Sequence, residues 1–421
     1  MITTLSVLLL ALLAPAQGTQ ADQWRQTQAD DYTRYELLAP ESRSFRIYYD
    51  VSATTPGVRY FFNGLREGSE HRVTEVIDRM TGKRLQWKIV SAAQAAASGV
   101  ANLRPQGQYL QVDLASKVPQ GGESRIRIDK TYRDPKSYFR EGDRIVFARS
   151  LGIKRNSLIL PAGYEVVACN YPSQVGLEPD GRLKVSFFNR GPTAVNFRVS
   201  ARLRKPSAGH REEAGSGPPA QTAYTTRRVH SGARIGYQFP ERAFQDREIV
   251  YFLQQPETHS FRLYHDYTET RPGQDRYLNL VRPGSRASNP SARLLDTGQK
   301  LKVETLRGKK AIQERGLKMP EAQDDTEVVV IWFDPVQPGH SVRLRIEETY
   351  TDHSRYLLSG EDLIWDRAFG RSQNAVLLPE GWYLTASAVP AVISEESGKI
   401  RLDFVNDRPG NLEVFIKARR R

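Results

Sequence analysis

YELLAPESRSFRIYYDVSATTPG, which starts at Tyr35, and YFLQQPETHSFRLYHDYTETRPG, which starts at Tyr251, are two versions of one segment. The offset between matching residues stays at 216 as far as Leu85, and 19 of these 51 positions are identical. Solenoid repeats recur every ~20–50 residues, far less than this period. The sequence therefore predicts a duplicated domain.

The similarity resumes at Arg125 and Arg343, now at an offset of 218 residues, and continues almost to the end of each copy. We place copy one at residues 32–205 and copy two at residues 246–421. The segment between them, 206–234, is rich in Gly, Pro, Ser and charge and has few apolar residues to bury. Such a composition is typical of a linker.

The N-terminus has the pattern of an export signal. An apolar run from Leu5 to Leu13 is followed by an A-x-A cleavage pattern that ends at Ala16, which predicts a signal peptide over residues 1–16. No later apolar stretch is long enough to span a membrane. Cys169 is the only cysteine, so no disulfide can form within the chain. Export without disulfides favours a bacterial protein that is periplasmic or extracellular.

The chain is strongly basic, with a formal net charge of +13. A basic exported protein can attract an envelope glycan, another polyanion or another envelope protein. The basic residues are dispersed, however, and the longest run is only Arg419 to Arg421. Arginine could therefore serve simply to solubilise a β-rich surface and to protect sheet edges. The charge alone leaves both interpretations open.

Apolar and polar residues alternate with a period of two in many segments, as from Phe45 to Ile47 and around Leu344. This pattern is typical of strands that bury one face. Short helices are expected only over 91–98 and 309–315, where the copies differ in length, and we expect these to be surface excursions. The sequence predicts an all-β fold with little helix, in which the two copies form two tandem antiparallel β-sandwich domains.

Two local features recur in each copy. In copy one a strand leads to a turn at Thr81-Gly82, and a glycine-rich turn precedes a strand that ends in Thr131-Tyr132. In this order of elements each copy resembles the β-rich N-terminal domain of M1-type aminopeptidases. The resemblance implies a β-rich fold. It implies no activity, because those enzymes hold their zinc motif in another domain, which this chain lacks.

Some polar residues recur at matching positions of the two copies. These pairs are Asp50 and Asp266, Asp134 and Asp352, Arg149 and Arg367, and Asn156 and Asn374. We interpret them as structural groups that hold loops, because short polar side chains near strand ends bond to the backbone. The alternative is that acids such as Asp134 and Asp352 act as paired catalytic carboxylates on a glycan.

Aromatic residues give a second hint about binding. Copy two has Trp365 and Trp382 where copy one has Phe and Tyr. Exposed rings could stack on sugars, and the same substitutions would equally suit a packed core. Tyr264 and His265 lie next to each other in a polar, aromatic stretch and form a second tentative ligand-binding surface.

No catalytic or metal-binding motif is present: the chain has no H-E-x-x-H, no G-x-S-x-G and no glycine-rich phosphate loop. We therefore assign no catalytic residue, metal ligand or cofactor. The expected function is that of an exported, non-catalytic tandem β-sandwich protein, a binding or scaffold module of the cell envelope for glycans or polyanions. The alternative is a glycan-active hydrolase that uses paired carboxylates.

Overall fold

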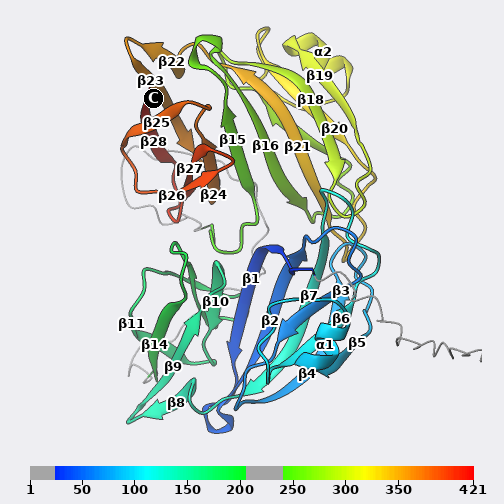
Figure 1. Cartoon of the computed structure of the whole chain (residues 1–421), viewed down its shortest axis with the longest axis vertical. Coiled ribbons are helices and arrows are strands. Elements are labelled where there is room, and N and C mark those ends of the chain that lie inside the picture. Colours follow the sequence, from blue (N-terminus) through cyan, green and yellow to red (C-terminus); the bar gives the residue numbers. More distant parts are fainter. Residues whose placement is uncertain (1–23, 205–239) are drawn as a thin grey trace, which may run out of the picture.

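The structure, a computed structural model, describes residues 24–204 and 240–421. The predicted signal peptide (1–16) and the predicted linker (206–234) lie outside the described residues. The chain is nearly all β, with 54% of residues in strands and 5% in helices. The prediction of two tandem, similar β-sandwich domains is confirmed, and Figure 1 shows copy one below copy two along the long axis.

The elements of copy one are β1 (Gln28–Leu37), η1 (Pro40–Ser42), β2 (Ser44–Ala53), β3 (Tyr60–Gly64), β4 (Glu70–Asp78), β5 (Trp87–Ser91), α1 (Ala92–Ala97), β6 (Gln108–Asp113), β7 (Ser124–Arg133), β8 (Tyr138–Glu141), β9 (Arg144–Leu151), β10 (Arg155–Ile159), β11 (Tyr164–Cys169), β12 (Gln174–Leu177), β13 (Leu183–Phe188) and β14 (Val195–Leu203).

The elements of copy two are β15 (Glu248–Leu253), η2 (Pro256–Thr258), β16 (Ser260–Glu269), β17 (Arg276–Leu280), β18 (Arg286–Leu294), β19 (Lys302–Arg307), α2 (Gly308–Glu314), β20 (Glu327–Trp332), β21 (Val342–Thr351), β22 (Tyr356–Ser359), β23 (Asp362–Phe369), β24 (Gln373–Leu377), β25 (Trp382–Ser387), β26 (Val392–Glu396), β27 (Lys399–Val405) and β28 (Leu412–Arg420).

Each copy folds into one large and two small sheets with the same strand order. Copy one has a seven-stranded sheet β12-β13-β10-β1-β2-β7-β4, a four-stranded sheet β11-β14-β9-β8 and a three-stranded sheet β3-β6-β5. In copy two the corresponding orders are β26-β27-β24-β15-β16-β21-β18, β25-β28-β23-β22 and β17-β20-β19. The strands pair antiparallel, except that β1 lies parallel to β10 and β15 lies parallel to β24.

The core of each copy lies between the inner face of the large sheet and the two small sheets. In copy one, Phe45 and Ile128 of the large sheet share a core with Val112 of the three-stranded sheet and Phe147 of the four-stranded sheet. Copy two has a matching core. Burying one such side chain contributes about 1.5–3 kcal/mol, so the alternation along each strand determines which face the small sheets cover.

The two predicted helices are present, and both are more buried than a surface excursion. Helix α1 begins at Ser91, whose hydroxyl accepts from the N–H of Gln94 at 3.2 Å in a capping box. Ala95 of α1 and Ile312 of α2 are fully buried. Each helix packs on the three-stranded sheet, on the side opposite the main core. The helices are therefore a third layer of each domain.

The two copies contact each other through equivalent residues. Arg125 of copy one donates to the hydroxyl and carbonyl oxygens of Ser341 at 3.2 and 3.3 Å. Arg343, the equivalent of Arg125, forms an ion pair at 3.0 Å with Glu123, the equivalent of Ser341. Each arginine therefore contacts the same position, two residues before the equivalent arginine, in the other copy.

The main chain repeats this reciprocity. The N–H of Glu123 donates to the carbonyl of Leu295 at 3.0 Å, and the hydroxyl of Ser341 donates to the carbonyl of Arg79, the equivalent of Leu295, at 2.7 Å. Gly122 permits this approach, because a Cβ there would lie 2.6 Å from the Leu295 oxygen. A surface that contacts its own equivalent defines a two-fold dimer, so the copies pack as a pseudo-dimer within one chain.

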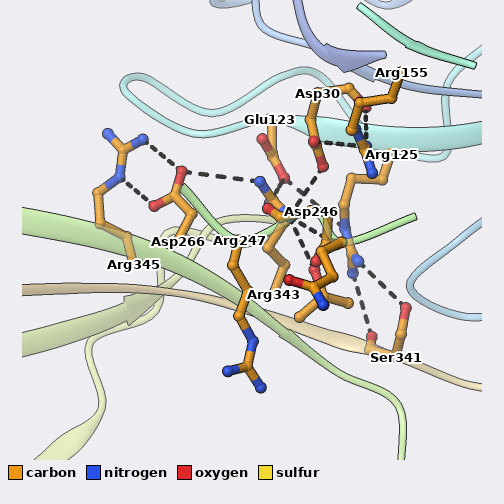
Figure 2. Close-up of polar contacts among 12 residues, drawn as sticks. Asp30, Glu123, Arg125, Arg155, Asp246, Arg247, Asp266, Ser341, Arg343 and Arg345 are labelled. Carbon is orange, nitrogen blue, oxygen red and sulfur yellow. Dashed lines mark hydrogen bonds and ion pairs between the residues drawn. The ribbon is translucent and has the colours of Figure 1, made fainter. Parts of the chain in front are cut away.

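A buried cluster of charges occupies the centre of this junction, as Figure 2 shows. The side chain of Arg343 is only 2% exposed, and its nitrogens lie 3.0–4.0 Å from the carboxylates of Asp30, Glu123, Asp246 and Asp266. These four acids come from both copies and from the segment that precedes β15. One guanidinium therefore links three parts of the chain.

Two neighbouring arginines complete the cluster. Arg125 forms a bidentate pair with Asp296 at 2.8 Å, and Arg155 bonds to Asp30 at 2.6 Å. Burial raises the pKa of Asp30 to about 6 and the pKa of Glu123 to about 7, even though nearby guanidinium groups oppose the shift. The junction is thus held by charges that have little water to compensate them.

Replacing the central cation tests the importance of the cluster. In Arg343→Gln, Asp30, Glu123 and Asp246 lose their shared partner, and removing one member of a buried ion pair costs about 3–5 kcal/mol. We expect a clear fall in the midpoint of urea unfolding. Arg72→Gln, which removes an exposed charge from β4, should change the unfolding free energy by less than about 0.5 kcal/mol. Equal midpoints for the two variants would contradict the assignment.

The raised pKa of Glu123 predicts a particular pH dependence. Glu123 faces Arg343 and Arg125 and also Asp266 and Asp296, and its pKa rises from 4.5 to about 7 on folding. The folded state therefore binds this proton more tightly, and stability falls as pH rises from about 4.5 to 7. In Glu123→Gln this loss is absent, so the melting temperature of the variant minus that of wild type should increase between pH 5 and 8. Parallel curves would contradict the prediction.

Candidate functional site

The two tryptophans that sequence analysis offered for sugar stacking are buried. Trp365 is 0% exposed and packs edge-to-face on Phe261, with the ring centroids 4.6 Å apart. Trp382 is 2% exposed, and its indole N–H donates to Gln255 at 2.9 Å. A sugar needs an open ring face. The interpretation of these two residues as ligand-binding residues is therefore wrong, and they belong to the core of copy two.

Tyr264 and His265 do not form one surface. Successive residues of a strand point to opposite faces of the sheet. Tyr264 lies on the outer face of the large sheet, where the guanidinium of Arg345 covers its ring at 4.0 Å. His265 is 1% exposed and faces the inside of the sandwich. The shared surface predicted from their adjacency is wrong, and only His265 lines a cavity.

Asp134 and Asp352 occupy the same position in the two copies. Each carboxylate accepts hydrogen bonds from the main-chain N–H groups two and three residues further along. Each also pairs at 3.2 Å with the recurring arginine of its own copy, Arg149 or Arg367. Both acids are therefore fully engaged with the turn that follows β7 or β21.

Asp50 and Asp266 lie within strands and not at turns. Asp50 belongs to β2 and forms a bidentate pair with Arg127, opposite it on β7, with both distances 2.6 Å. Asp266 pairs in the same way with Arg345 at 2.8 and 2.9 Å. Their predicted loop-holding role is wrong, since each instead bridges two strands of the large sheet.

Asn156 and Asn374 each bond to the main chain just before their own strand. The amide nitrogen of Asn156 donates to the carbonyl of Ile153 at 2.7 Å. That of Asn374 donates to the carbonyl of Arg371 at 2.9 Å. This contact holds the end of the loop before β10 and β24. In copy two it also positions Arg371 at the edge of a cavity.

A cavity of about 380 Å³ lies inside copy two, between the inner face of the large sheet and the two small sheets. Its polar lining comes from separate strands: His265 from β16, Asn279 from β17, Glu348 from β21 and Arg367 from β23. Pockets for small ligands have volumes of about 300–1,000 Å³ and contain a few well-placed polar groups. The size and lining therefore suit a small molecule.

Positive charge dominates this cavity. Four arginines line it: Arg247, Arg282, Arg367 and Arg371. Arg367 pairs with Asp352, whereas the other three form no ion pair within 4.0 Å in the described part of the chain. Figure 2 shows the side chain of Arg247 directed away from the junction cluster. Uncompensated guanidinium groups in a cavity favour an anionic ligand.

Glu348 is the acid that lines the cavity. Both of its carboxylate oxygens accept from the amide nitrogen of Asn279, at 3.0 and 2.8 Å. Burial raises the pKa of Glu348 above its ordinary value. One carboxyl group of raised pKa does not neutralise the arginines, so the cavity keeps a positive charge.

His265 and Arg371 form a hydrogen-bonded pair in this cavity, 2.7 Å apart from Nδ1 to Nη2. Because guanidinium only donates, Nδ1 accepts and the imidazole proton lies on Nε2. Burial and the charges of Arg371 and Arg247 hold the pKa of His265 well below its usual range, so the ring is neutral at neutral pH. Nε2 of His265 and Nη1 of Arg371 are buried with no partner among the described residues.

Copy one has different residues at these positions. Ile153 takes the place of Arg371, and Tyr49 takes the place of His265. Asp31 takes the place of Arg247, and it accepts a hydrogen bond from the Tyr49 hydroxyl at 3.2 Å. Copy one therefore lacks the unpartnered donors of copy two at these positions, although Oδ1 of Asp31 is buried without a partner among the described residues.

Copy one also has a basic residue in place of the acidic residue that lines the cavity of copy two. Lys130 stands at the position of Glu348 and donates to Asn63 Oδ1 at 2.5 Å, whereas Asn279, the equivalent of Asn63, donates to Glu348. An asparagine amide can serve either partner because it carries both a donor and an acceptor. Burial lowers the pKa of Lys130 to about 7. The scaffold is shared, and the internal chemistry is specific to each copy.

Sequence reasoning missed most of this cavity. Arg282 and Asn279 lie at identical positions in the repeat, with Arg66 and Asn63 in copy one, yet neither attracted notice. Arg371 has no counterpart of its own type in copy one. The signal that would have found it is divergence between the copies at inward-facing positions.

No helix among the described residues is long and apolar enough to cross a membrane. Within residues 24–204 and 240–421, no three His, Cys, Asp or Glu residues are placed to hold a metal ion together.

No protein-family model matches the chain, and no curated protein matches it. Solved structures match it in part. An M1 zinc metallopeptidase from Deinococcus radiodurans is 11% identical with a TM-score of 0.27, over 43% of this chain and 42% of that chain. An aminopeptidase N family protein from Idiomarina loihiensis is 13% identical with a TM-score of 0.25, over 41% of this chain and 29% of that chain. Scores this low carry no argument, and the resemblance to M1 enzymes stays a prediction.

The two recurring turn acids should support stability equally. Asp134→Asn and Asp352→Asn each leave a largely buried arginine, Arg149 or Arg367, with a weaker partner. We expect each to lower the free energy of unfolding by about 1–3 kcal/mol, measured by urea titration. Asp143→Asn, in the exposed turn between β8 and β9, should change it by less than about 0.5 kcal/mol. An unchanged midpoint for Asp352→Asn would show that the turn does not need the charge.

Proposed function

We propose that this protein is an exported, non-catalytic binding or scaffold module of the cell envelope, made of two β-sandwiches, and that it takes an anionic ligand in the cavity of copy two. Copy one and the junction would serve as a rigid support for the binding copy. The location, periplasmic or extracellular, rests on the predicted signal peptide and is part of the proposal.

The observation that carries the proposal is the set of unpaired donors in the cavity. Arg247, Arg282 and Arg371 line it without an ion pair in the described residues, and His265 presents a buried N–H that has no partner. Arg247 is exposed and Arg282 is half-buried, so the desolvation cost falls on the buried Nη1 group of Arg371, which has lost water without gaining a counter-charge. An anion that enters the cavity would recover this energy, which supports ligand binding there.

The outer faces of the large sheets are weaker candidates for anion binding than the cavity. Four of their arginines are matched by acids on the same or on a neighbouring strand, which reduces the positive charge there that could attract a polymer. Neutralised pairs of this kind contribute specific strand contacts and little long-range field. The pairs are Arg46 with Asp129, Arg127 with Asp50, Arg345 with Asp266, and Arg401 with Asp403.

The hydrolase alternative has less support. It depends on Asp134 and Asp352, which belong to different copies and which each accept from turn N–H groups and an arginine. A catalytic acid or base must instead reach the substrate with an available proton or lone pair. We therefore propose binding in preference to glycan hydrolysis.

Removing one cavity arginine should weaken binding of anions. The full chain would be titrated calorimetrically with inorganic phosphate, with a uronic acid and with heparin, at low and at high salt. For any anion that binds, Arg371→Ile should raise Kd at least tenfold; isoleucine is the residue that copy one has at this position. Arg72→Ile, on the surface of copy one, changes net charge equally and should leave Kd unchanged.

Salt dependence separates cavity binding from surface binding. Buried charges are screened less than exposed ones, so a cavity ligand should keep most of its affinity at high salt. Binding that disappears with salt and is equally weakened by both arginine variants would assign it to the surface charge. If no anion binds at all, the proposed function is wrong.

A further inference from the structure

We propose that the cavity of copy two binds a small hydroxylated carboxylate, the chemical class of the acidic sugars. Its carboxylate would bind Arg371 and His265, and its hydroxyl groups would bind Glu348 and Asn279. This inference rests on the proposed function, because it names the class of anion that the module takes. It is carried by two sets of polar groups in the cavity, which are unpartnered donors at one end and acceptors at the neighbouring end.

Arg371 and His265 form the donor end. Nη2 of Arg371 is committed to Nδ1 of His265, which leaves the Nη1 group of the arginine and the Nε2–H of the imidazole. Both atoms are buried and lack partners among the described residues. A carboxylate has two acceptor oxygens and a full negative charge, so it can satisfy both donors and the guanidinium together. A neutral alcohol would leave the charge uncompensated.

The donor end is also the more positive end. Arg371 bonds to the imidazole of His265 at 2.7 Å, and Arg247 lines the same cavity. Both charges lower the pKa of His265. The imidazole itself is neutral and therefore adds a directional N–H without further charge. A monoanion suits this environment, since it meets two guanidinium groups and one neutral donor.

Glu348 and Asn279 form the acceptor end. The carboxylate of Glu348 accepts from the Asn279 amide nitrogen and from the Tyr350 hydroxyl, although a carboxylate offers about four acceptor positions. The remaining positions suit the O–H groups of a ligand. Burial raises the pKa of Glu348, and a protonated carboxyl can also donate to an alcohol oxygen. Alcohols both donate and accept, so they fit either state.

Strand order places the two ends next to each other. His265 lies on β16 and Glu348 lies on the neighbouring strand β21, where it is opposite Leu263. Diagonal neighbours on one face of two antiparallel strands are about 7–8 Å apart, so the donor end and the acceptor end can contact one small molecule. A compact ligand whose hydroxyl groups lie close to its carboxylate matches this spacing.

Other anions match the cavity less well. Phosphate carries a second negative charge at neutral pH and would be repelled by Glu348 when that group is ionised. It also lacks alcohol groups for the acceptor end. A polyanion needs a groove, whereas a volume of about 380 Å³ inside the sandwich accommodates one small molecule.

Asn374 contributes nothing to this selectivity. Its Oδ1 is buried without a donor, but so is Oδ1 of the equivalent Asn156 in copy one. Copy one has Ile153 and Tyr49 in place of the donor pair. The unpartnered amide oxygen is therefore a property of the shared fold and not of the cavity.

A four-ligand comparison on the full chain tests the inference. D-glucuronate, D-glucose, acetate and inorganic phosphate would each be titrated calorimetrically into wild type, Arg371→Ile, Glu348→Gln and Arg72→Ile. D-glucuronate should bind at least tenfold more tightly than each of the other three. Arg371→Ile should raise the Kd for D-glucuronate at least tenfold. Glu348→Gln should reduce the ratio of the Kd for acetate to the Kd for D-glucuronate. Arg72→Ile should change neither the Kd for D-glucuronate nor this ratio.

The outcomes separate this inference from the proposed function. If phosphate or acetate binds as tightly as D-glucuronate and still depends on Arg371, the acidic-sugar class is wrong and the anion site stands. If D-glucose binds as tightly as D-glucuronate, or if none of the anions depends on Arg371, both are wrong. Melting curves of each variant verify that it remains folded, and Glu348→Asp provides a second test of the acceptor end if Glu348→Gln unfolds.

Discussion

The guanidinium of Arg343 is the interaction on which the rest of the molecule depends, because it joins carboxylates from both copies in one buried cluster. One of them, Asp246, lies 3.0 Å from Nη1. Its neighbours Gln245 and Arg247 line the cavity of copy two. The segment that closes one side of the candidate site is therefore fixed by the junction, and copy one takes part in the site without contributing a residue to it.

Duplication explains how the two halves could acquire different interiors. The pseudo-two-fold junction and the paired cores use equivalent residues in both copies, so selection on stability acts on both. The interior polar positions do not contribute to the junction. At these positions Lys130 and Tyr49 of copy one are replaced by Glu348 and His265 in copy two. The two copies thus share a scaffold, and copy two alone has the unpartnered donors of His265 and Arg371.

The sequence was sufficient for the fold class because alternation along a strand is a local property, and strands such as β2 and β7 display it clearly. Pairing is not local: β1 lies parallel to β10, with Tyr32 opposite Arg155, and periodicity carries no information about such partners. Asp50 was expected near a strand end, but the strand continues to Ala53. The cavity was missed because its residues lie on strands far apart in the chain. The sequence signal for it was the divergence of Arg371, Glu348 and His265 from their counterparts in copy one.

The positive charge inside copy two is itself an argument for a ligand. Structural needs alone would have replaced Arg371 by an apolar residue, as copy one does with Ile153 at the same place in the fold. An apolar side chain there would bury hydrophobic area and remove a guanidinium that has no counter-charge in the described chain, and such replacements are often neutral or stabilising. The arginine and an imidazole whose proton it directs to Nε2 are thus not explained by stability, and the proposed binding of an anion would explain them.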